Sequence, residues 1–238
     1  PLRGDDTYLL DMAGRVVHRW HFTDLKPGYG RLLENGNLLI LGNDPSAPIP
    51  PDASDGKSTL TLSQRYRGIG GNASRIWEVD WDGNLVWSYE NEAIHHDFVR
   101  LSNGNTLLVQ WIPMSEDQAR SVRGGIRPPK KDAVTMLGDE FIEVNPAGEI
   151  VWRASLVDLL DGRKDAICPL ENRGEWTHVN GLDVNDDDEL LYSCRTNSAV
   201  GIIDRQSGTL MWKLPHGMVY HQHHPTWQAG RKVQLFDN

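Results

Sequence analysis

Apolar residues along this chain come in short runs that alternate with polar residues and are interrupted by glycine-containing turns. One phrase combines an acidic or amide residue, a turn glycine, two or three apolar residues and a tryptophan, and it occurs four times. Its turn glycines are 69, 65 and 60 residues apart. Alternating runs on both sides of a glycine turn predict a β-hairpin. The four copies span residues 10–20, 79–87, 144–152 and 203–212.

A second phrase lies between the copies of the first. Residues 31–41 and 100–109 each carry Asn-Gly between two apolar runs, which is the strongest short-range hairpin signal. Weaker copies have their turns at residues 185–188 and 229–232. Each unit of about 60–70 residues therefore holds two predicted hairpins, or four strands.

Units of four strands cannot bury both sheet faces alone, so we expect them to stack around an axis as an all-β propeller of four-stranded blades. A generic β-sandwich is the alternative, but it does not require this period. Residues 1–238 are thus predicted to form a single propeller domain with about four visible blades. The chain lacks an initiator Met and ends just after an apolar strand. We expect it to be truncated at the C-terminus, with N-terminal truncation as a further expectation.

Three segments depart from the repeat and are expected to be long loops, which often carry function. They span residues 42–74, 112–138 and 156–174, and the last is expected to include a short helix near residues 156–160. The second segment is basic, so it could attract an anionic substrate or simply be solvated. Its basic residues are Arg120, Arg123, Arg127, Lys130 and Lys131.

Charge and composition exclude several classes of protein. The 24 basic and 33 acidic residues give a net charge of −9, which argues against nucleic acid as a partner. No apolar run approaches the roughly 20 residues of a membrane span. Cys168 and Cys194 lack metal-type spacing, so no zinc site is expected. A disulfide between them and two free thiols are both left open.

Three histidines fall at one place in the repeat, namely the start of the first strand after each long connection. Each lies twelve residues before an apolar residue of the following strand, and the first unit has a glycine there. Equivalent blade positions converge at one end of a propeller axis, so we expect a shared pocket rather than coincidence. The four pairs are His96–Leu108, His178–Leu190, His223–Leu235 and Gly28–Ile40.

Clustered histidines can bind a metal or act as acid, base or nucleophile. The residues near them favour the second kind of chemistry. Asn180 follows His178 closely, and an amide suits an oxyanion better than a hard cation. Arg195 follows in the same unit, and its planar guanidinium pairs with sulfate or phosphate oxygens. Together these side chains predict a site for a tetrahedral oxyanion, without a metal.

These phrases resemble the bacterial aryl-sulfate sulfotransferase family, which does not use the nucleotide sulfate donor. The resemblance covers essentially the whole chain and rests on the order and spacing of several phrases. They are Thr7–Trp20, His95–Phe98, Trp176–Asn180, Ser193–Arg195, and Gln222–His223 followed by Leu235–Asn238.

The resemblance implies a six-bladed propeller, exported to the periplasm or secreted, that needs no cofactor. It implies ping-pong transfer of a sulfuryl group from an aryl sulfate to a phenol through a sulfated histidine. His223 would be the nucleophile, and His96, His178, Asn180 and Arg195 would hold the sulfuryl oxygens. His224 stands where the family often has Asp or Thr, so the choice among His221, His223 and His224 stays open. The expected partners are these small molecules, with a homodimer left open.

Seven of the nine tryptophans fall into two groups. Those of the repeated phrase, Trp20, Trp87, Trp152 and Trp212, are predicted to pack in the core. Aromatic residues nearer the histidine phrases could instead stack on aryl rings or also belong to the core. They are Trp111, Trp176, Tyr220 and Trp227.

Two other functions are considered. Residues 204–212 are similar to the tryptophan-docking phrase of quinoprotein dehydrogenases, but the vicinal cysteines and calcium ligands of those enzymes are missing. A non-catalytic propeller that binds proteins or glycans is the other alternative. It would not require histidines and an arginine that point inward.

Overall fold

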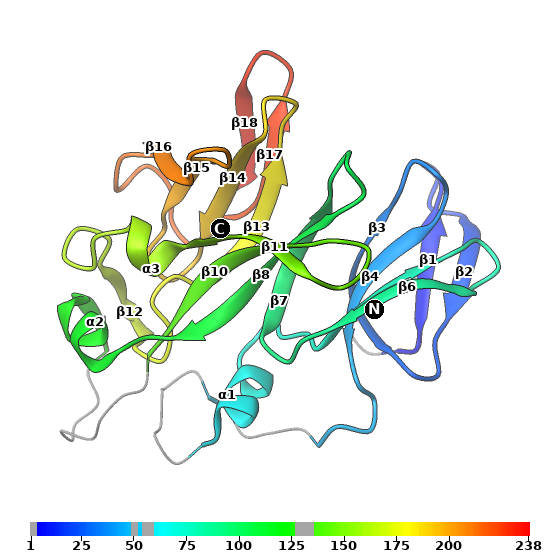
Figure 1. Cartoon of the computed structure of the whole chain (residues 1–238), viewed down its shortest axis with the longest axis horizontal. Coiled ribbons are helices and arrows are strands. Elements are labelled where there is room, and N and C mark those ends of the chain that lie inside the picture. The colour runs from blue at the N-terminus through cyan, green and yellow to red at the C-terminus, as the bar shows by residue number, and fades with distance from the viewer. Residues whose placement is uncertain (1–3, 49–51, 54–59, 127–135) are drawn as a thin grey trace.

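The computed structural model of the chain describes residues 4–48, 52–53, 60–126 and 136–238. It contains three four-stranded antiparallel sheets, flanked by two hairpins (Figure 1). The sheets are β3 (Lys26–Leu32), β4 (Leu38–Asn43), β5 (Arg75–Val79) and β6 (Leu85–Glu90); β7 (Ile94–Arg100), β8 (Thr106–Pro113), β10 (Leu137–Val144) and β11 (Ile150–Ser155); and β13 (Val179–Val184), β14 (Glu189–Cys194), β15 (Val200–Asp204) and β16 (Thr209–Lys213). The hairpins are β1 (Asp6–Leu10) with β2 (Val16–His21) and β17 (His223–Gln228) with β18 (Lys232–Phe236).

All eight predicted hairpins are present, and local turn chemistry explains them. Gly36 and Gly104 of the two Asn-Gly turns both have φ +85°, a conformation that strains other L-residues. In the weaker third turn, Asp188 takes this role at φ +60°. Each sheet consists of a second-phrase hairpin followed by a first-phrase hairpin. The four predicted units therefore form three complete sheets and two half-sheets.

Strand β4 shows how the sheets pack. Leu38 and Ile40 belong to a buried cluster shared with β1–β2, whereas Leu39 and Leu41 belong to one shared with the sheet of β7 and β8. Since successive side chains of a strand point to opposite faces, both faces of this sheet are covered by neighbouring sheets. A two-layer sandwich would leave one face of each sheet to solvent. The β-propeller prediction is confirmed.

The blades are tied together by the tryptophans of the repeated phrase. Three of them donate an indole hydrogen bond to a backbone carbonyl in the next blade. Trp212, the fourth, is 41% exposed, so the prediction that it packs in the core is wrong. The bonds run from Trp20 Nε1 to Asp80 O (2.9 Å), from Trp87 Nε1 to Pro146 O (3.1 Å) and from Trp152 Nε1 to Arg205 O (2.9 Å).

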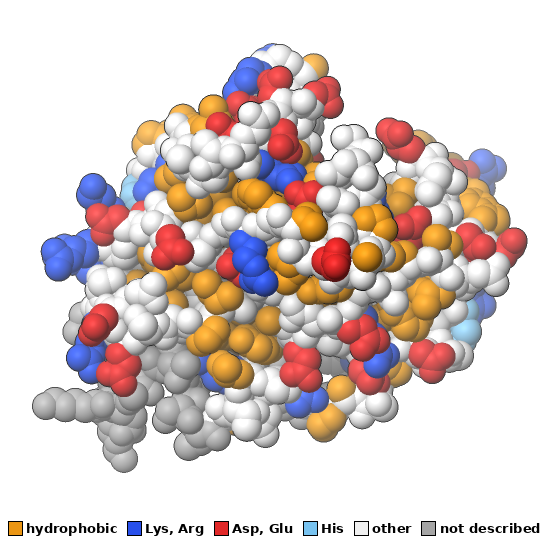
Figure 2. All heavy atoms as spheres, in the orientation of Figure 1, with side chains coloured by type: hydrophobic (Ala, Val, Ile, Leu, Met, Phe, Trp, Pro, Cys, Tyr) orange, Lys and Arg blue, Asp and Glu red, His pale blue; other side chains and the backbone are white. Residues whose placement is uncertain are grey.

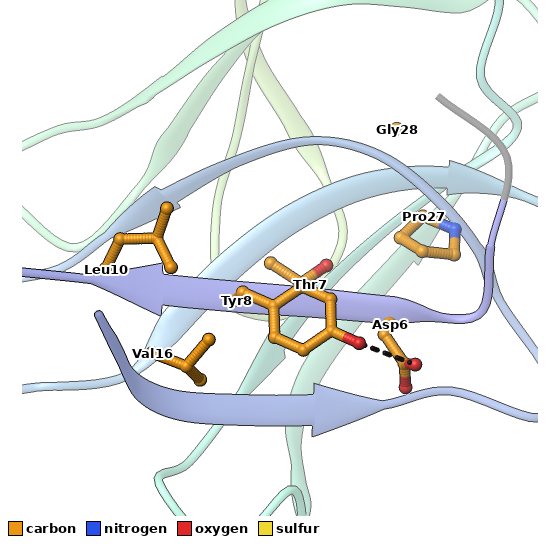
Figure 3. A pocket seen from close by; sticks show the side chains of 7 residues that line it. All are labelled: Asp6, Thr7, Tyr8, Leu10, Val16, Pro27 and Gly28. Atoms are coloured by element: carbon orange, nitrogen blue, oxygen red, sulfur yellow. Dashed lines mark hydrogen bonds between the residues drawn. The ribbon is translucent and has the colours of Figure 1, made fainter. Parts of the chain in front are cut away.

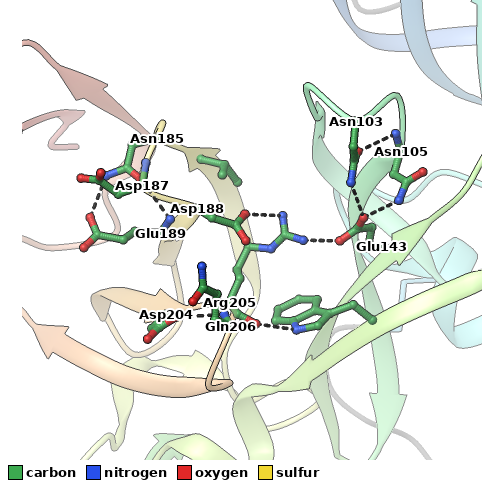
Figure 4. Close-up of polar contacts among 12 residues, drawn as sticks. Asn103, Asn105, Glu143, Asn185, Asp187, Asp188, Glu189, Asp204, Arg205 and Gln206 are labelled. Atoms are coloured by element: carbon green, nitrogen blue, oxygen red, sulfur yellow. Dashed lines mark hydrogen bonds and ion pairs between the residues drawn. The ribbon is translucent and has the colours of Figure 1, made fainter.

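A buried carboxylate makes a second kind of link between blades (Figure 4). Glu143 accepts from the side chains of Asn103 and Asn105 in its own sheet and pairs with Arg205 of the next. The Arg205 guanidinium also lies over the Trp152 ring, 5.0 Å from its centroid. Glu78 with Arg100, and Glu189 with Arg231, repeat this arrangement.

The three expected loops carry more regular structure than predicted. They contain α1 (Leu62–Gly68), α2 (Glu116–Ser121), β9 (Gly124–Ile126), α3 (Leu156–Leu159) and β12 (Ile167–Asn172). The expected short helix near residues 156–160 is confirmed as α3, while the parallel pairing of β9 with β12 was not anticipated. Of the basic cluster, Arg127, Lys130 and Lys131 lie outside the described residues.

Cys168 and Cys194 are both free thiols, which decides between the two alternatives for them. None of the described helices is long and apolar enough to cross a membrane. Acidic and basic side chains are interspersed on the face shown in Figure 2, which therefore has no extended region of one charge.

Candidate functional site

The site lies where the first strands of the blades begin. Strand β7 contacts β13, which in turn contacts β17, so the first strands meet along the axis. At the starting end of these strands is a cavity of about 410 Å³. Its lining includes residues from four different blades, among them Gly28, Tyr29, His96, Asn180, His223 and His224.

His96 and His178 lie together at this end of the axis. Their ring centroids are 4.5 Å apart and their planes are inclined by 69°. Both residues have positive φ, +53° and +51°, in a region that costs a residue other than glycine about 1–3 kcal/mol. Such strain is typical of functional sites and here orients both rings.

The equal spacing of twelve residues does not place His96 and His178 at the same position in the pairing register of their hairpins. Arg100 of β7 pairs with Thr106, and Val184 of β13 pairs with Leu190. His96 is four residues before the first of these pairs, whereas His178 is six residues before the second. Irregularities in both ladders absorb this difference and still bring the two rings together.

His223 begins β17, and its hydrogen bonds define its tautomer. Nδ1 is 2.9 Å from the carbonyl oxygen of His221, so Nδ1 carries the proton and donates it. The Asn238 amide nitrogen lies near the same two atoms. Nε2 is therefore the ring nitrogen with a free lone pair. Burial, and then the charge of Arg195, lower the pKa of His223, which keeps the ring neutral near pH 7.

The environments of His96 and His178 shift their pKa values in opposite directions. Burial, and then the charge of His178, lower the pKa of His96 well below its ordinary value. Burial also acts against the charged form of His178, but the Glu175 carboxylate, 2.8 Å from His178 Nδ1, outweighs it and raises that pKa. Paired groups with divergent pKa values mark acid and base roles. These shifts favour a protonated His178 and a neutral His96.

Arg195 and Asn180 lie beside these rings. The Arg195 backbone N–H donates to the carbonyl oxygen of His178 (3.0 Å), and its guanidinium pairs with Glu171 at 2.8 Å. Asn180 is buried and donates from Nδ2 to the carbonyl oxygen of Gln222 (2.7 Å). That bond uses one of its two amide hydrogens and leaves the other.

For Trp111 and Trp176, burial favours core packing over the alternative of stacking on an aryl ring. Trp111 is 1% exposed, stacks on His95 at 4.1 Å and donates to Glu175. Trp176 is 2% exposed and donates to the carbonyl oxygen of Asp165. Both are core residues that hold the site in place.

Tyr220 and Trp227 lie away from the cavity lining. Tyr220 is 61% exposed, and its backbone N–H bonds to Asp237. Trp227 lines a separate groove with Trp212 and Arg231. The aromatic residue that does line the cavity is Tyr29, which sequence reasoning missed although it directly follows Gly28.

Three further residues behind the cavity were also missed. They are His95, Asp139 and Glu175, all buried. The His95–His96 doublet was a visible signal, but nothing in the sequence near Asp139 or Glu175 indicates which histidine each contacts. Among the residues that the structure describes, no group of three or more His, Cys, Asp or Glu could hold a metal ion.

A second cavity, of about 400 Å³, lies between the first hairpin and the start of β3 (Figure 3). Its acidic residue, Asp6, already bonds Tyr8, Arg19 and His21. The remaining lining is mostly apolar or backbone. This cavity has none of the converging donors that an oxyanion requires.

Solved structures with similar folds are distant in sequence. The hydrazine synthase of Kuenenia stuttgartiensis matches with a TM-score of 0.56 and 12% identity over 100% of this chain and 66% of that one. A protein of unknown function from Bacteroides caccae matches with a TM-score of 0.47 and 12% identity, over 91% of this chain and 56% of that one. The virginiamycin B lyase of Staphylococcus aureus gives 0.47 and 13%, over 98% and 71%.

The first of these likenesses shows the fold alone. The chain spans 56% and 66% of the first two structures. No curated protein matches it significantly. The family described as Arylsulfotransferase (ASST), however, matches residues 3–224, a range that includes His96, His178 and His223. The chain belongs to the arylsulfotransferase family.

Proposed function

We propose that the axial cavity is the centre of a nucleotide-independent aryl-sulfate sulfotransferase that works by a ping-pong mechanism through His223. The supporting observation is that His96 and His223, from separate strands, line one cavity, that the His178 ring lies against His96, and that His223 Nε2 is free. The proposal includes the six-bladed, exported parent protein that the family resemblance implies.

In the first half-reaction, His223 Nε2 attacks the sulfur of the aryl sulfate. The N–S bond forms as the bond from sulfur to the aryl oxygen breaks, and the aryl oxygen leaves with the bonding electrons. In the second half-reaction, the oxygen of an acceptor phenol attacks the same sulfur and loses its proton. His223 is then released as a neutral imidazole. Covalent catalysis of this kind divides one difficult displacement into two easier ones.

Protonated His178 and Arg195 would neutralise charge on the sulfuryl oxygens, and the remaining amide hydrogen of Asn180 would add a neutral donor. Preorganised donors of this kind are a major source of rate acceleration. The Arg195 backbone is bonded to His178, and the charge of its guanidinium acts on both His96 and His223. Tyr29 is the aromatic side chain available to contact an aryl ring.

Among the three candidate nucleophiles, His223 is favoured by its hydrogen bonds. His221 Nε2 lies 3.5 Å from Glu171, which directs that ring toward a carboxylate. His224 also lines the cavity, but it packs edge-on against Tyr29 with ring centroids 6.1 Å apart. Only for His223 does a backbone carbonyl define which nitrogen is unprotonated.

Mass spectrometry tests the proposal directly. The full-length protein mixed with 4-nitrophenyl sulfate alone should gain one sulfuryl group on the peptide that contains His223. His223→Ala should abolish this adduct and turnover, whereas His216→Ala, which changes a half-exposed histidine outside the cavity lining, should retain both. An adduct that persists in His223→Ala would assign the nucleophile elsewhere. Anion binding without any adduct in the wild type would support the non-catalytic alternative.

A further inference from the structure

His96 is connected to a buried carboxylate through its neighbour in the sequence. His95 Nδ1 lies 2.8 Å from His96 Nδ1, and His95 Nε2 lies 3.0 Å from Asp139 Oδ1. His95 and Asp139 are both fully buried, at 0% exposure. Asp139 Oδ2 accepts from the Thr177 hydroxyl and the Val179 backbone N–H. Both Asp139 oxygens, both His95 nitrogens and His96 Nδ1 therefore have a partner.

The proton positions follow from the partners. A carboxylate only accepts hydrogen bonds, so His95 Nε2 carries a proton and donates it to Asp139. A neutral His95 then has an unprotonated Nδ1, and the 2.8 Å contact places the shared proton on His96 Nδ1. His96 Nε2 is left with a free lone pair. His96 lines the cavity, so this arrangement makes it a base for a molecule bound there.

The charges around His96 disfavour its protonated form. His178, His95, His223 and Arg195 all act against its charged form. A proton taken up there is stabilised if the positive charge moves to a neighbouring group that has a carboxylate beside it. His95 is the adjacent acceptor and has the Asp139 carboxylate on its far side. The other ionisable groups near Asp139 are the His178 imidazole and the Cys194 thiol.

We infer that His95 and Asp139 form a proton relay that allows His96 to deprotonate the acceptor phenol. This inference rests on the proposed function. The phenol O–H bond breaks as its oxygen bonds to sulfur, and its proton goes to His96 Nε2. In the same step the proton on His96 Nδ1 passes to His95 Nδ1. The resulting His95 imidazolium is paired with Asp139, and after the aryl sulfate product leaves, the reverse shift releases the proton from His96 Nε2 to solvent and restores the neutral pair.

Within this relay, His96 is the catalytic residue, and His95 and Asp139 are positioning residues. Asp139→Asn separates this role from simple packing, since it preserves shape. Its amide N–H would face His95 Nε2 and move the His95 proton to Nδ1. His96 Nε2 would then carry a proton and could no longer act as a base. His95→Phe should interrupt the relay in a different way, because a phenyl ring can still stack on Trp111.

Two half-reactions measured with the full-length protein provide the test. Release of 4-nitrophenolate from 4-nitrophenyl sulfate needs little acid assistance, so its burst should stay within a few-fold of wild type in Asp139→Asn. Transfer from the sulfated enzyme to phenol should fall roughly 100-fold at neutral pH, the lower part of the range for general acid–base catalysis. The ratio of the variant rate to the wild-type rate at the same pH should rise toward one as the pH approaches about 10, where a phenol ionises by itself. His95→Phe should behave in the same way.

Asp183→Asn is the matched control, because Asp183 also accepts from the backbone, at the N–H groups of Val184 and Trp227, and neither bond involves a histidine. It should keep the wild-type pH profile. The relay is wrong if Asp139→Asn transfers the sulfuryl group to phenol at the wild-type rate. It is also wrong if the nitrophenolate burst falls as much as the transfer to phenol and the transfer rate does not recover relative to wild type at high pH.

A measurement on the wild type covers the case in which the variants fail to fold. The rate of sulfuryl transfer to phenol should be measured in mixtures of H₂O and D₂O. Plotted against the deuterium fraction, it should be curved in the way expected when two protons move in the transition state. A straight line would overturn the relay. Failure of the proposed function looks different, because the wild type would then show neither a nitrophenolate burst nor a sulfated histidine.

Discussion

The first strands β3 and β7 line the same cavity but differ in what they contribute. Strand β7 brings His96, backed by His95, whereas β3 brings Gly28 and Tyr29 at the corresponding place. The two strands have the same hairpin turn and pack in the same way against their partners. The difference teaches that residues facing the axis at a strand start are free of core packing, so repeats with one architecture can diverge there.

The two sides of the cavity are therefore expected to have distinct roles. The side of β7, β13 and β17 provides imidazoles and would carry out the proposed chemistry. On the side of β3, the lining residues Gly28 and Tyr29 are uncharged, and Tyr29 provides a phenol ring. Substitutions on the first side should change catalysis by orders of magnitude, and those on the second side should change mainly the binding of the aryl group.

The largest effect is expected on stability, at Asp97, where the strands of the two sides are joined. Asp97 of β7 accepts from Arg31 Nη2 of β3 (2.9 Å) and from the Leu182 backbone N–H of β13 (3.0 Å). Asp97→Ala would leave a largely buried guanidinium and a buried N–H without a partner. We expect the free energy of unfolding to fall by about 3 kcal/mol, near the low end for a broken buried pair because Arg31 is partly exposed. Urea denaturation measures this, and an unchanged midpoint would contradict it.

The second largest effect is expected when the charge of His178, which directly precedes β13, is removed. His178→Gln keeps a side chain that can donate a hydrogen bond but removes the positive charge. The second-order rate constant for sulfuryl transfer should fall by about 100- to 1,000-fold, the usual cost of losing one transition-state donor. Steady-state kinetics with 4-nitrophenyl sulfate provide the measurement. A loss below tenfold would show that His178 does not contact the sulfuryl group.

A smaller, directional effect concerns pH. His223 must be neutral, and its lowered pKa means that activity is lost only as the pH falls below the ordinary histidine value of about 6.5. His178 must be protonated, and its raised pKa means that activity is lost as the pH rises above that value. Activity should therefore be maximal in a window that includes about pH 6.5.

Glu175→Gln sharpens this prediction. It removes the charge that raises the pKa of His178, so the alkaline side of the profile should move to lower pH while the acidic side stays in place. Glu116→Gln, which changes an exposed carboxylate on α2, should move neither side. A profile that narrows from the acidic side instead would reverse the assigned roles.

The smallest effect is expected on the β3 side. Tyr29→Phe keeps the ring and removes only the hydroxyl, so the rate constant should change by less than tenfold, the equivalent of about 1.4 kcal/mol. Tyr29→Ala should instead raise KM for aryl substrates more than it lowers kcat. A loss in Tyr29→Phe as large as that in His178→Gln would mean that β3 also takes part in the chemistry.

The hairpins and the axial meeting of the histidines followed from residues close in sequence. The Asn-Gly turns and the alternation of apolar residues are local features, and eight hairpins could be placed from them. Their 60–70-residue period then implied blades around an axis. Because strands that begin near an axis bring their first residues together, His96, His178 and His223 could be grouped without coordinates.

The partners of those histidines were decided only by the tertiary structure. Asp139 lies on β10 and reaches His95 on β7, 44 residues away, and no local pattern encodes such a pairing. The same holds for Trp111, whose stacking on His95 and bond to Glu175 place it in the core rather than against substrate. Turn type and strand periodicity depend on neighbours along the chain, whereas burial, tautomer and pKa depend on which distant side chains share a space. The fold could therefore be predicted from the sequence, but the electrostatics of the site could not.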